Sequence, residues 1–280
     1  MYWPKITVVT PTYNRDEYLE ETLLSVLNQN YPNLEYIIVD GGSTNPHIFE
    51  IIRRYEDKLA WWISEPDSGH AEAIRKGFDR ASGEILAWLC SDDTYLPGAL
   101  LAVGEAFRKY PDADVIYGHY NAIDQNGRII RNGRVVRYHP LQVLANGNIH
   151  QASVFWTKNI YQKAGGNVGG FNLEFTKYSP DSDLYFRFIK AGAKWILLPR
   201  TLSTFRIHPD HTTTRETEAV WAHYWKAART NFPFWTLPGI YQLVCVYTRI
   251  RRLILLIAQS DTKNILAKFA QRPLKEQEIL

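Results

Sequence analysis

The chain has 280 residues, of which 45% are hydrophobic and 14% aromatic, and its formal net charge is +3. This length and apolar content suffice for one large domain or two small ones with a well-packed core. A charge so close to balance gives no reason to expect a nucleic acid as partner. Cys90 and Cys245 show neither a disulfide framework nor zinc-site spacing, which favours a reducing, cytoplasmic compartment.

The first 120 residues alternate strand-like and helix-like segments. Strands are expected at 6–10, 36–39, 59–64, 84–90 and 115–120, with helices at 15–29, 46–56, 70–81 and 97–109. This alternation predicts an α/β fold with right-handed βαβ units and a mostly parallel sheet. Four strands are followed by polar loops, so we expect these loops to gather on one rim of the sheet: 11–15, 40–44, 65–69 and 91–94.

Two adjacent carboxylates, Asp92 and Asp93, follow the densest apolar run of this region, residues 84–90. Such a run is typical of a strand buried on both faces. Crowded carboxylates are costly unless a cation or hydrogen bonds compensate them, and a hard divalent ion bridging to a diphosphate would do so. On this segment alone, an Asp-rich turn that caps the next helix is an equally good interpretation.

After residue 120 the pattern changes. We expect a hairpin around Asn132-Gly133 and, further along, a strand at 150–156, a helix at 182–191 and a strand at 195–198. Residues 211–280 look like a helical appendage. We therefore expect one domain in two halves, 1–125 and 126–210, with a helical C-terminal extension at 211–280.

Five motifs stand in a recognisable order: Thr10-Pro-Thr-Tyr-Asn-Arg15, Val39-Asp-Gly-Gly-Ser43, Glu65-Pro-Asp-Ser-Gly69, Ser91-Asp-Asp93 and Pro180-Asp-Ser-Asp-Leu184. Over roughly residues 4–210 the chain resembles family 2 glycosyltransferases, which are inverting enzymes with the GT-A fold. The resemblance implies a mostly parallel sheet flanked by helices. It makes 1–125 the nucleotide-sugar-binding half and 126–210 the acceptor-binding and catalytic half.

The resemblance also implies a role for each matching residue. The donor nucleotide would be bound by Pro11, Tyr13, Asp40, Asp67, Arg75 and Asp92. Asp93 would hold a Mg²⁺ or Mn²⁺ ion on the diphosphate, with His208 as a second ligand or phosphate contact, and His150 and Gln151 would lie near the acceptor or sugar. The alternatives remain ordinary ones, because Asp40 and Asp67 also suit turns and a lone histidine is more often structural.

Asp181 matches the catalytic base of the family. Inversion in one step needs a carboxylate that takes the proton of the attacking hydroxyl on the face opposite the leaving group. Asp183 is expected to cap the following helix, and Asp181 itself is an alternative cap. The chain departs from the family at Gly41 and Pro180, where relatives often have acids, and at Arg75, where many have Asn.

Residues 238–259 are apolar but contain Arg249, Arg251 and Arg252. A helix here is too charged to span a bilayer and suits its surface, although packing on the domain or on a second subunit is the alternative. Four more arginines, at 128, 131, 134 and 137, could face an anionic acceptor, but a solvated hairpin is the favoured interpretation.

The expected function is transfer of a sugar, with inversion, from a nucleotide-diphosphate-sugar to a hydroxyl of a glycan or lipid-linked acceptor of the cell-surface polysaccharide type. We expect a cytoplasmic enzyme, with a peripheral position on the inner face of the membrane as a further hypothesis. One alternative is a non-catalytic nucleotide- or carbohydrate-binding protein of this fold, favoured by the departures at Gly41, Arg75 and Pro180. A nucleotidyltransferase is less favoured, because the loop after the first strand is not Gly-rich.

Overall fold

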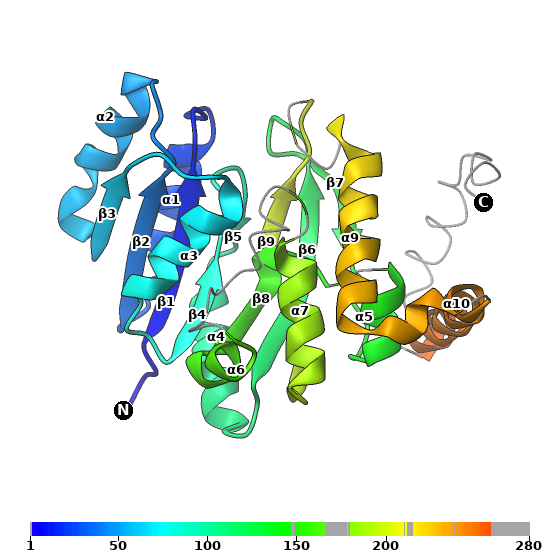
Figure 1. Ribbon diagram of the computed structural model, residues 1–280. Coiled ribbons are helices and arrows are strands. Elements are labelled where there is room, and N and C mark those ends of the chain that lie inside the picture. The colour runs from blue at the N-terminus through cyan, green and yellow to red at the C-terminus, as the bar shows by residue number, and fades with distance from the viewer. Residues whose placement is uncertain are drawn as a thin grey trace.

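The computed structural model describes residues 2–146, 149–165, 178, 180–209, 211, 215–237 and 239–258. Within these residues nine strands form one sheet (Figure 1). The strands are β1 Ile6–Thr12, β2 Leu34–Asp40, β3 Trp61–Ser64, β4 Ile85–Trp88, β5 Thr94–Tyr95, β6 Val115–Ile123, β7 Ile129–Gly133, β8 Val154–Thr157 and β9 Trp195–Arg206.

The helices of the described residues are α1 Leu19–Leu27, α2 Pro46–Arg54, α3 His70–Arg80, α4 Ala99–Lys109, α5 Pro140–Asn146, α6 Lys158–Lys163, α7 Pro180–Lys190, α9 Thr217–Asn231 and α10 Ile240–Ala258. Short 3₁₀ turns stand at η1 Glu56–Lys58, η2 Gln151–Ser153 and η4 Pro233–Thr236.

The strand order is β3-β2-β1-β4-β8-β6-β9-β5, and β7 pairs with β6. Strands β3, β2, β1 and β4 are parallel, as the alternating pattern predicts. Beyond β4 the sheet is mixed, because β8 runs antiparallel to both β4 and β6 whereas β9 runs parallel to β6. One sheet therefore joins the two expected halves, and the boundary at 125 falls in the turn between β6 and β7.

Two hydrophobic layers cover the sheet. One side of β1 and β2, with Val8 and Ile38, packs on α1, α2 and α4. The other side, with Val9 and Val39, packs on α3, and the same layer continues through α6, α7 and α9. Successive residues of a strand point to opposite faces, so the run 36–39 of β2 is apolar throughout because both faces are covered.

The hairpin expected around Asn132-Gly133 is wrong in register. The turn lies at Asp124–Gly127, where the Asp124 carboxylate accepts bonds from the N–H groups of Asn126 and Arg128, each at 2.9 Å. Asn132 and Gly133 lie in β7, opposite Asn121 and Tyr120. A Cβ on Gly133 would stand 2.4 Å from the Tyr120 ring, so this glycine permits a close approach within a strand.

Two further expectations need correction. Helix α7 begins at Pro180, so Asp183 lies inside the helix and is no N-cap. Its buried carboxylate instead accepts hydrogen bonds from Arg187 Nε at 2.9 Å and from Asn231 Nδ2 at 3.0 Å, which ties α7 to α9. Strand β9 is longer than expected, and its second half pairs with the short strand β5, which the sequence pattern did not predict.

The C-terminal extension contains α9 and α10, and α10 packs against α5 and η4 (Figure 1). Residues 238 and 259, at the two ends of the expected surface helix, and 260–280 lie outside the described residues. Among the helices of the described ranges, none has both the length and the apolar character needed to cross a bilayer.

Candidate active site

A cleft of about 1280 Å³ opens at the carboxyl ends of β1–β4. The loops after all four of these strands line it, together with η2 and the start of α7. Eight of the residues singled out from the sequence stand on its wall: Pro11, Tyr13, Asp67, Asp92, Asp93, His150, Gln151 and Asp181. The expected gathering of the loops on one rim is therefore what the structure shows, and Asp181 joins them from a distant helix.

Three other candidates, Asp40, Arg75 and His208, are not among the described lining residues. Asp40 is fully buried, and its carboxylate accepts bonds from Ser43 N at 2.8 Å and Ser64 Oγ at 2.6 Å, so it holds its own loop together. Arg75 lies on α3 beside Glu72, at 4.0 Å.

The departure at Gly41 has a structural reason. A Cβ built on Gly41 would stand 2.8 Å from Asp67 Oδ2, so the Asp67 carboxylate occupies the space that a second acid would need. Gly69 N donates to Asp67 Oδ1 at 2.8 Å, which fixes that carboxylate. Burial raises the pKa of Asp67. At this side of the cleft the loop after β3 therefore presents one acid, Asp67, and the loop after β2 presents a glycine without a side chain, Gly41.

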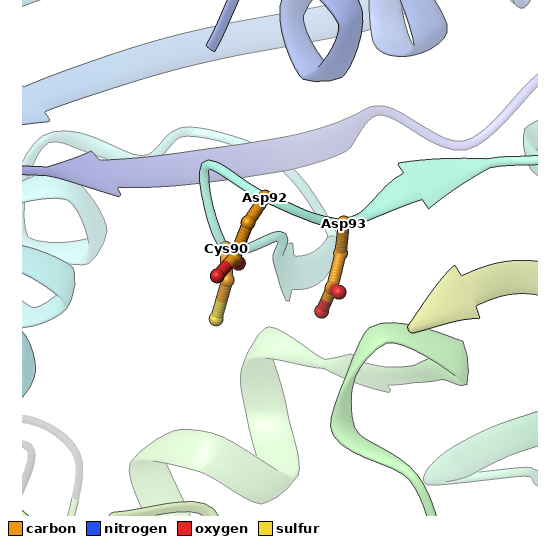
Figure 2. Close-up of side chains that lie close together, drawn as sticks. All are labelled: Cys90, Asp92 and Asp93. Carbon is orange, nitrogen blue, oxygen red and sulfur yellow. The ribbon is translucent and has the colours of Figure 1, made fainter. Parts of the chain in front are cut away.

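The acid pair after β4 points into the cleft beside Cys90 (Figure 2). One ligand atom each of Cys90, Asp92 and Asp93 lie within 4.8 Å of one another. Burial, and then the charge of Asp92, raise the pKa of Asp93 well above its usual value. Burial also acts to raise the pKa of Asp92, but the hydrogen bond to His208 and the charges of His211 and Arg15 lower it overall.

Two side chains, Arg15 and His208, contact the carboxylate of Asp92. Arg15 Nη1 and His208 Nε2 lie 3.2 and 3.1 Å from its Oδ2, and 3.2 Å from each other. The Nε2 atom of His208, which is buried, is therefore engaged with Asp92. In this arrangement His208 orients the acid pair and does not itself line the cleft.

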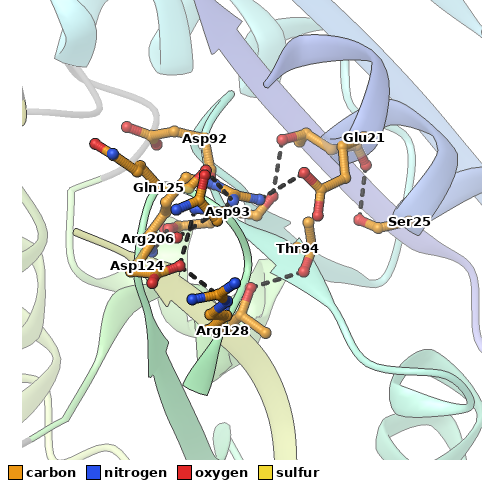
Figure 3. Close-up of polar contacts among 12 residues, drawn as sticks. Glu21, Ser25, Asp92, Asp93, Thr94, Asp124, Gln125, Arg128 and Arg206 are labelled. Atoms are coloured by element: carbon orange, nitrogen blue, oxygen red, sulfur yellow. Dashed lines mark hydrogen bonds and ion pairs between the residues drawn. The ribbon is translucent and has the colours of Figure 1, made fainter. Parts of the chain in front are cut away.

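Arg206 forms hydrogen bonds with the same loop (Figure 3). Its backbone N–H donates to Asp93 Oδ1 at 3.0 Å, its Nε donates to the Asp92 carbonyl at 3.0 Å, and its Nη2 lies 2.6 Å from Glu21 Oε2. The guanidinium also stacks over the Tyr18 ring at 4.3 Å. Because Arg206 is almost fully buried, it fixes the positions of both aspartates without facing the cleft.

The donor set fits a hard divalent cation. Two carboxylates converge, and Asp93 is buried with a raised pKa, so a nearby positive charge would compensate it. Burial raises the pKa of the Cys90 thiol well above its usual value, so a neutral thiol stands beside the acids. Mg²⁺ and Mn²⁺ prefer oxygen to such a soft donor, which leaves Asp92 and Asp93 as the residues that would hold the ion.

Asp181 is the second residue of α7 and lines the cleft. Burial raises its pKa, and backbone N–H groups at the start of the helix offset part of that effect. A carboxylate with a raised pKa is a stronger base than a solvated one, and at a cleft wall it can accept a proton from a bound hydroxyl.

Residues 150 and 151 connect the two sides of the cleft. The His150 ring stacks on Tyr120 with centroids 4.4 Å apart and lies 4.3 Å from the Phe205 ring. Burial lowers the pKa of His150 to about 3, so its imidazole is neutral near pH 7. Gln151 Nε2 donates to the Trp88 carbonyl at 2.6 Å, which ties η2 to the end of β4.

Sequence reasoning missed several lining residues. His70, whose pKa burial lowers to about 4, lies 3.6 Å from the Cys90 sulfur. The opposite wall holds a larger group: Arg131, Asn132 and Arg134 around the end of β7, Trp221 and Tyr224 on α9, and Arg252 on α10. Of these, the sequence had raised Arg131 and Arg134 for an anionic acceptor, as the less favoured interpretation. His70 follows a predicted strand-end loop and was open to prediction, whereas the opposite wall is assembled by tertiary packing.

The comparisons with known proteins agree with this geometry. A family model described as Glycosyl transferase family 2 matches residues 7–175. An uncharacterized glycosyltransferase of Rickettsia typhi is 28% identical over 239 residues, which are 80% of this chain and 73% of the relative. One from Rickettsia felis is 29% identical over 201 residues, 69% of this chain but only 32% of that relative's length. TuaG of Bacillus subtilis, named for teichuronic acid biosynthesis, is 40% identical over 95 residues, 33% of this chain and 37% of TuaG.

Two solved structures share the fold. S. aureus TarS superposes with a TM-score of 0.62 at 18% identity, over 81% of this chain and 65% of the TarS chain. The mannosyltransferase PcManGT from Pyrobaculum calidifontis, in complex with GDP-Man and Mn²⁺, superposes with a TM-score of 0.56 at 19% identity, over 96% of this chain and 80% of the other. These neighbours confirm the expected GT-A fold, and the family match covers more than half of the sequence. The chain belongs to glycosyl transferase family 2.

Proposed function

We propose that this protein transfers a sugar from a nucleotide-diphosphate-sugar to an acceptor hydroxyl, with inversion at the anomeric carbon. The observation that supports this most strongly is the composition of one cleft. Acids from separate strand-end loops, Asp67, Asp92 and Asp93, share it with Asp181 from α7. A site for the donor diphosphate and a carboxylate for the acceptor proton are the two requirements of a one-step displacement.

The donor nucleotide is assigned to the wall formed by the β1 and β3 loops. Tyr13 is 63% exposed at the cleft, so its ring face is available to a nucleobase. TarS has been solved with UDP and with UDP-GlcNAc, and PcManGT with GDP-Man. For this chain we propose a nucleotide-sugar donor bound by Pro11, Tyr13 and Asp67, with Asp40 supporting the neighbouring loop from the interior.

Asp93 and Asp92 would hold a Mg²⁺ or Mn²⁺ ion. When bound, that ion would stabilise negative charge on the departing nucleoside diphosphate. The chain supplies the rest of the arrangement, since Arg15 and His208 hold Asp92 while Arg206 holds the loop. The role of His208 thus becomes one of positioning the aspartate, in place of the expected direct ligation.

Asp181 takes the role of general base. Its carboxylate accepts the proton of the acceptor hydroxyl as the oxygen attacks, and burial, which raises its pKa, makes that transfer more favourable. His150 and Gln151 line the same cleft and are assigned to the sugar or acceptor. The neutral His150 ring can contact a sugar without introducing a charge.

The acceptor is proposed to be a glycan or a lipid-linked glycan, and α10 supports the second. The helix exposes an apolar stripe made of Leu243, Val246, Tyr247, Ile250, Leu253, Ile254 and Ile257. Arg249 is exposed on the same helix, which contains no acidic residue, and this favours an anionic membrane surface as the partner of that stripe. Two other apolar residues of α10, Ile240 and Val244, are outside the stripe and pack on the core.

A thermal-shift screen of nucleotide sugars tests the proposal. The full chain should be stabilised by at least one nucleotide-diphosphate-sugar in the presence of Mn²⁺ and much less in a chelator. Transfer to a pool of polysaccharide and lipid-linked acceptors should then require the ion. Saturable donor binding without any product would favour the non-catalytic alternative. Transfer of a nucleotidyl group would favour the nucleotidyltransferase, and full activity in chelator would contradict the metal assignment.

A further inference from the structure

The wall of the cleft opposite the donor loops carries three guanidinium groups. Arg131 from β7, Arg134 just after β7 and Arg252 from α10 all line the cleft, and we call these three residues the basic wall. The acidic lining residues that the structure describes are Asp67, Asp92, Asp93 and Asp181. They come from the loops after β3 and β4 and from α7, and none comes from β7 or α10. All four arginines of the expected solvated hairpin, at 128, 131, 134 and 137, are exposed, and two of them, Arg131 and Arg134, also line the cleft.

Specific contacts hold this wall in place. Arg252 Nη2 donates to the Arg134 carbonyl at 3.2 Å, and Arg251 Nη2 donates to the Arg137 carbonyl at 3.0 Å. These two hydrogen bonds attach α10 to the segment 134–137. Arg131 Nη2 lies 3.4 Å from Tyr120 Oη. Burial, and then the charge of the exposed Arg131, lower the pKa of Arg252.

The basic wall is separate from the proposed donor site. The donor loops follow β1, β2, β3 and β4, whereas β7 hangs on β6, and β8 stands between β4 and β6 in the sheet. The donor side has its own pair of acids for a metal ion, and its cation Arg15 is paired with Asp92. A metal ion on these acids would compensate the donor diphosphate on that side of the cleft, away from Arg131, Arg134 and Arg252.

We infer that the basic wall binds an anionic group of the acceptor, specifically a phosphate attached to it. This inference rests on the proposed function. Guanidinium groups match phosphate oxygens through paired N–H donors, and several of them converging on one cleft suit a multiply charged anion better than a neutral sugar.

Arg252 and the apolar stripe of α10 lie on opposite sides of the helix. Arg252 lines the cleft, whereas Ile250 and Ile254, each two positions away and so about 200° around the helix, are exposed on the stripe. A phosphate bound at Arg252 is therefore separated from the stripe by the width of the helix. The phosphate chemistry is the same for a lipid phosphate and for a phosphate within a glycan, and the two sources differ only in the alkyl chain.

Calorimetric titration of the full chain tests the inference. The protein is first saturated with Mg²⁺ and whichever of UDP or GDP binds, and is then titrated with inorganic phosphate or with octyl phosphate below its micellar concentration. We expect binding that leaves the nucleotide in place. The double variant R131Q/R252Q should weaken it about tenfold or more, because charge-assisted hydrogen bonds are lost. Nucleotide affinity should stay within about twofold.

Two further variants serve as controls for this experiment. R137Q removes the same charge from the same segment outside the cleft and should bind phosphate like the wild type. R131Q alone changes an exposed side chain, so it keeps the experiment informative if the double variant fails to fold. Tighter binding of octyl phosphate than of inorganic phosphate supports a lipid source, and equal binding supports a glycan phosphate.

The inference is overturned if neither phosphate binds the wild type, if phosphate binds only by displacing the nucleotide, or if the arginine variants bind as well as R137Q. Failure of UDP, GDP and the nucleotide sugars to bind at all would instead contradict the proposed function. Arginine-dependent phosphate binding would then still establish the anion site.

Discussion

The two sides of the cleft are constructed differently. The donor side takes its residues from loops that directly follow parallel strands, and buried groups such as Asp40 and Arg206 hold those loops. The opposite side takes its residues from β7, which pairs with β6 in the same sheet, and from η2, α9 and α10, which reach β7 through contacts between separate elements. The comparison suggests that the donor site is anchored in the sheet, whereas the acceptor side depends on contacts between separate elements.

Asp93→Asn tests the donor side and should have the largest effect on activity. Loss of an ion ligand should lower transfer at least about a hundredfold, because the charge of the leaving diphosphate is no longer compensated. The variant should also lose most of the stabilisation that Mn²⁺ gives in thermal melts. An unchanged response to Mn²⁺ would show that the ion, if it binds, does so without Asp93.

In the metal-free protein, Asp93→Asn should increase the stability of the fold. The pKa of Asp93 is higher in the folded state than in the unfolded chain. At a pH between these two pKa values, the folded protein therefore binds more protons than the unfolded chain does. Stability of the wild type in chelator should therefore fall as the pH rises through that window, and Asp93→Asn should remove this fall. Melting temperatures at several pH values in chelator measure it, and a variant less stable than the wild type at pH 7 would contradict the account.

Asp183→Ala tests how the acceptor side holds α7. The substitution leaves Arg187 and Asn231 without a buried carboxylate, and breaking such a contact costs about 3 kcal/mol in the free energy of unfolding. Because α7 carries Asp181, kcat should fall more than donor affinity does. Denaturant unfolding and steady-state kinetics measure the two effects. Asp79→Asn, which removes an exposed carboxylate from α3, serves as the control and should change neither.

Ile254→Glu tests the outer surface of α10 and should have the smallest effect on the enzyme itself. Binding to anionic vesicles should weaken about tenfold, since an apolar side chain is replaced by a charge that the surface repels. Turnover with a water-soluble acceptor should be unchanged. Ile129→Glu is a matched control, because Ile129 is 58% exposed and Ile254 is 59% exposed. Equal loss in both variants would contradict a membrane contact specific to α10.

The same contrast explains what could be predicted from the sequence. Strand ends gather at one rim of a parallel sheet, so Pro11, Asp67, Asp92 and Asp93 could be placed together from motif order alone. The resemblance to the family supplied Asp181, whose helix no local pattern connects to the rim. The family pattern did not reveal that His208 faces Asp92 or that Asp40 is buried, because those facts depend on side-chain packing.

The basic wall could be predicted only in part, because the sequence raised Arg131 and Arg134 as the less favoured interpretation and gave no sign of Arg252 beside them. Arg131 and Arg252 are 121 positions apart, and nothing local to either residue indicates that α10 folds back along the segment after β7. The hairpin was misplaced because Asn-Gly is a strong turn signal, whereas Asp124 and Gly127 made the turn and Gly133 accommodated the Tyr120 ring. Tertiary contacts decided both cases, and in the hairpin they overrode a local preference.

The most direct test of the central claim, that Asp181 acts on the complex formed by the donor-side acids, is the kinetics of Asp181→Asn. The amide keeps the size of the side chain but cannot accept the proton, so kcat should fall by about 10²–10⁴ while the donor KM and nucleotide affinity stay within about twofold. A variant that keeps wild-type turnover, or that loses donor binding together with activity, would contradict the account.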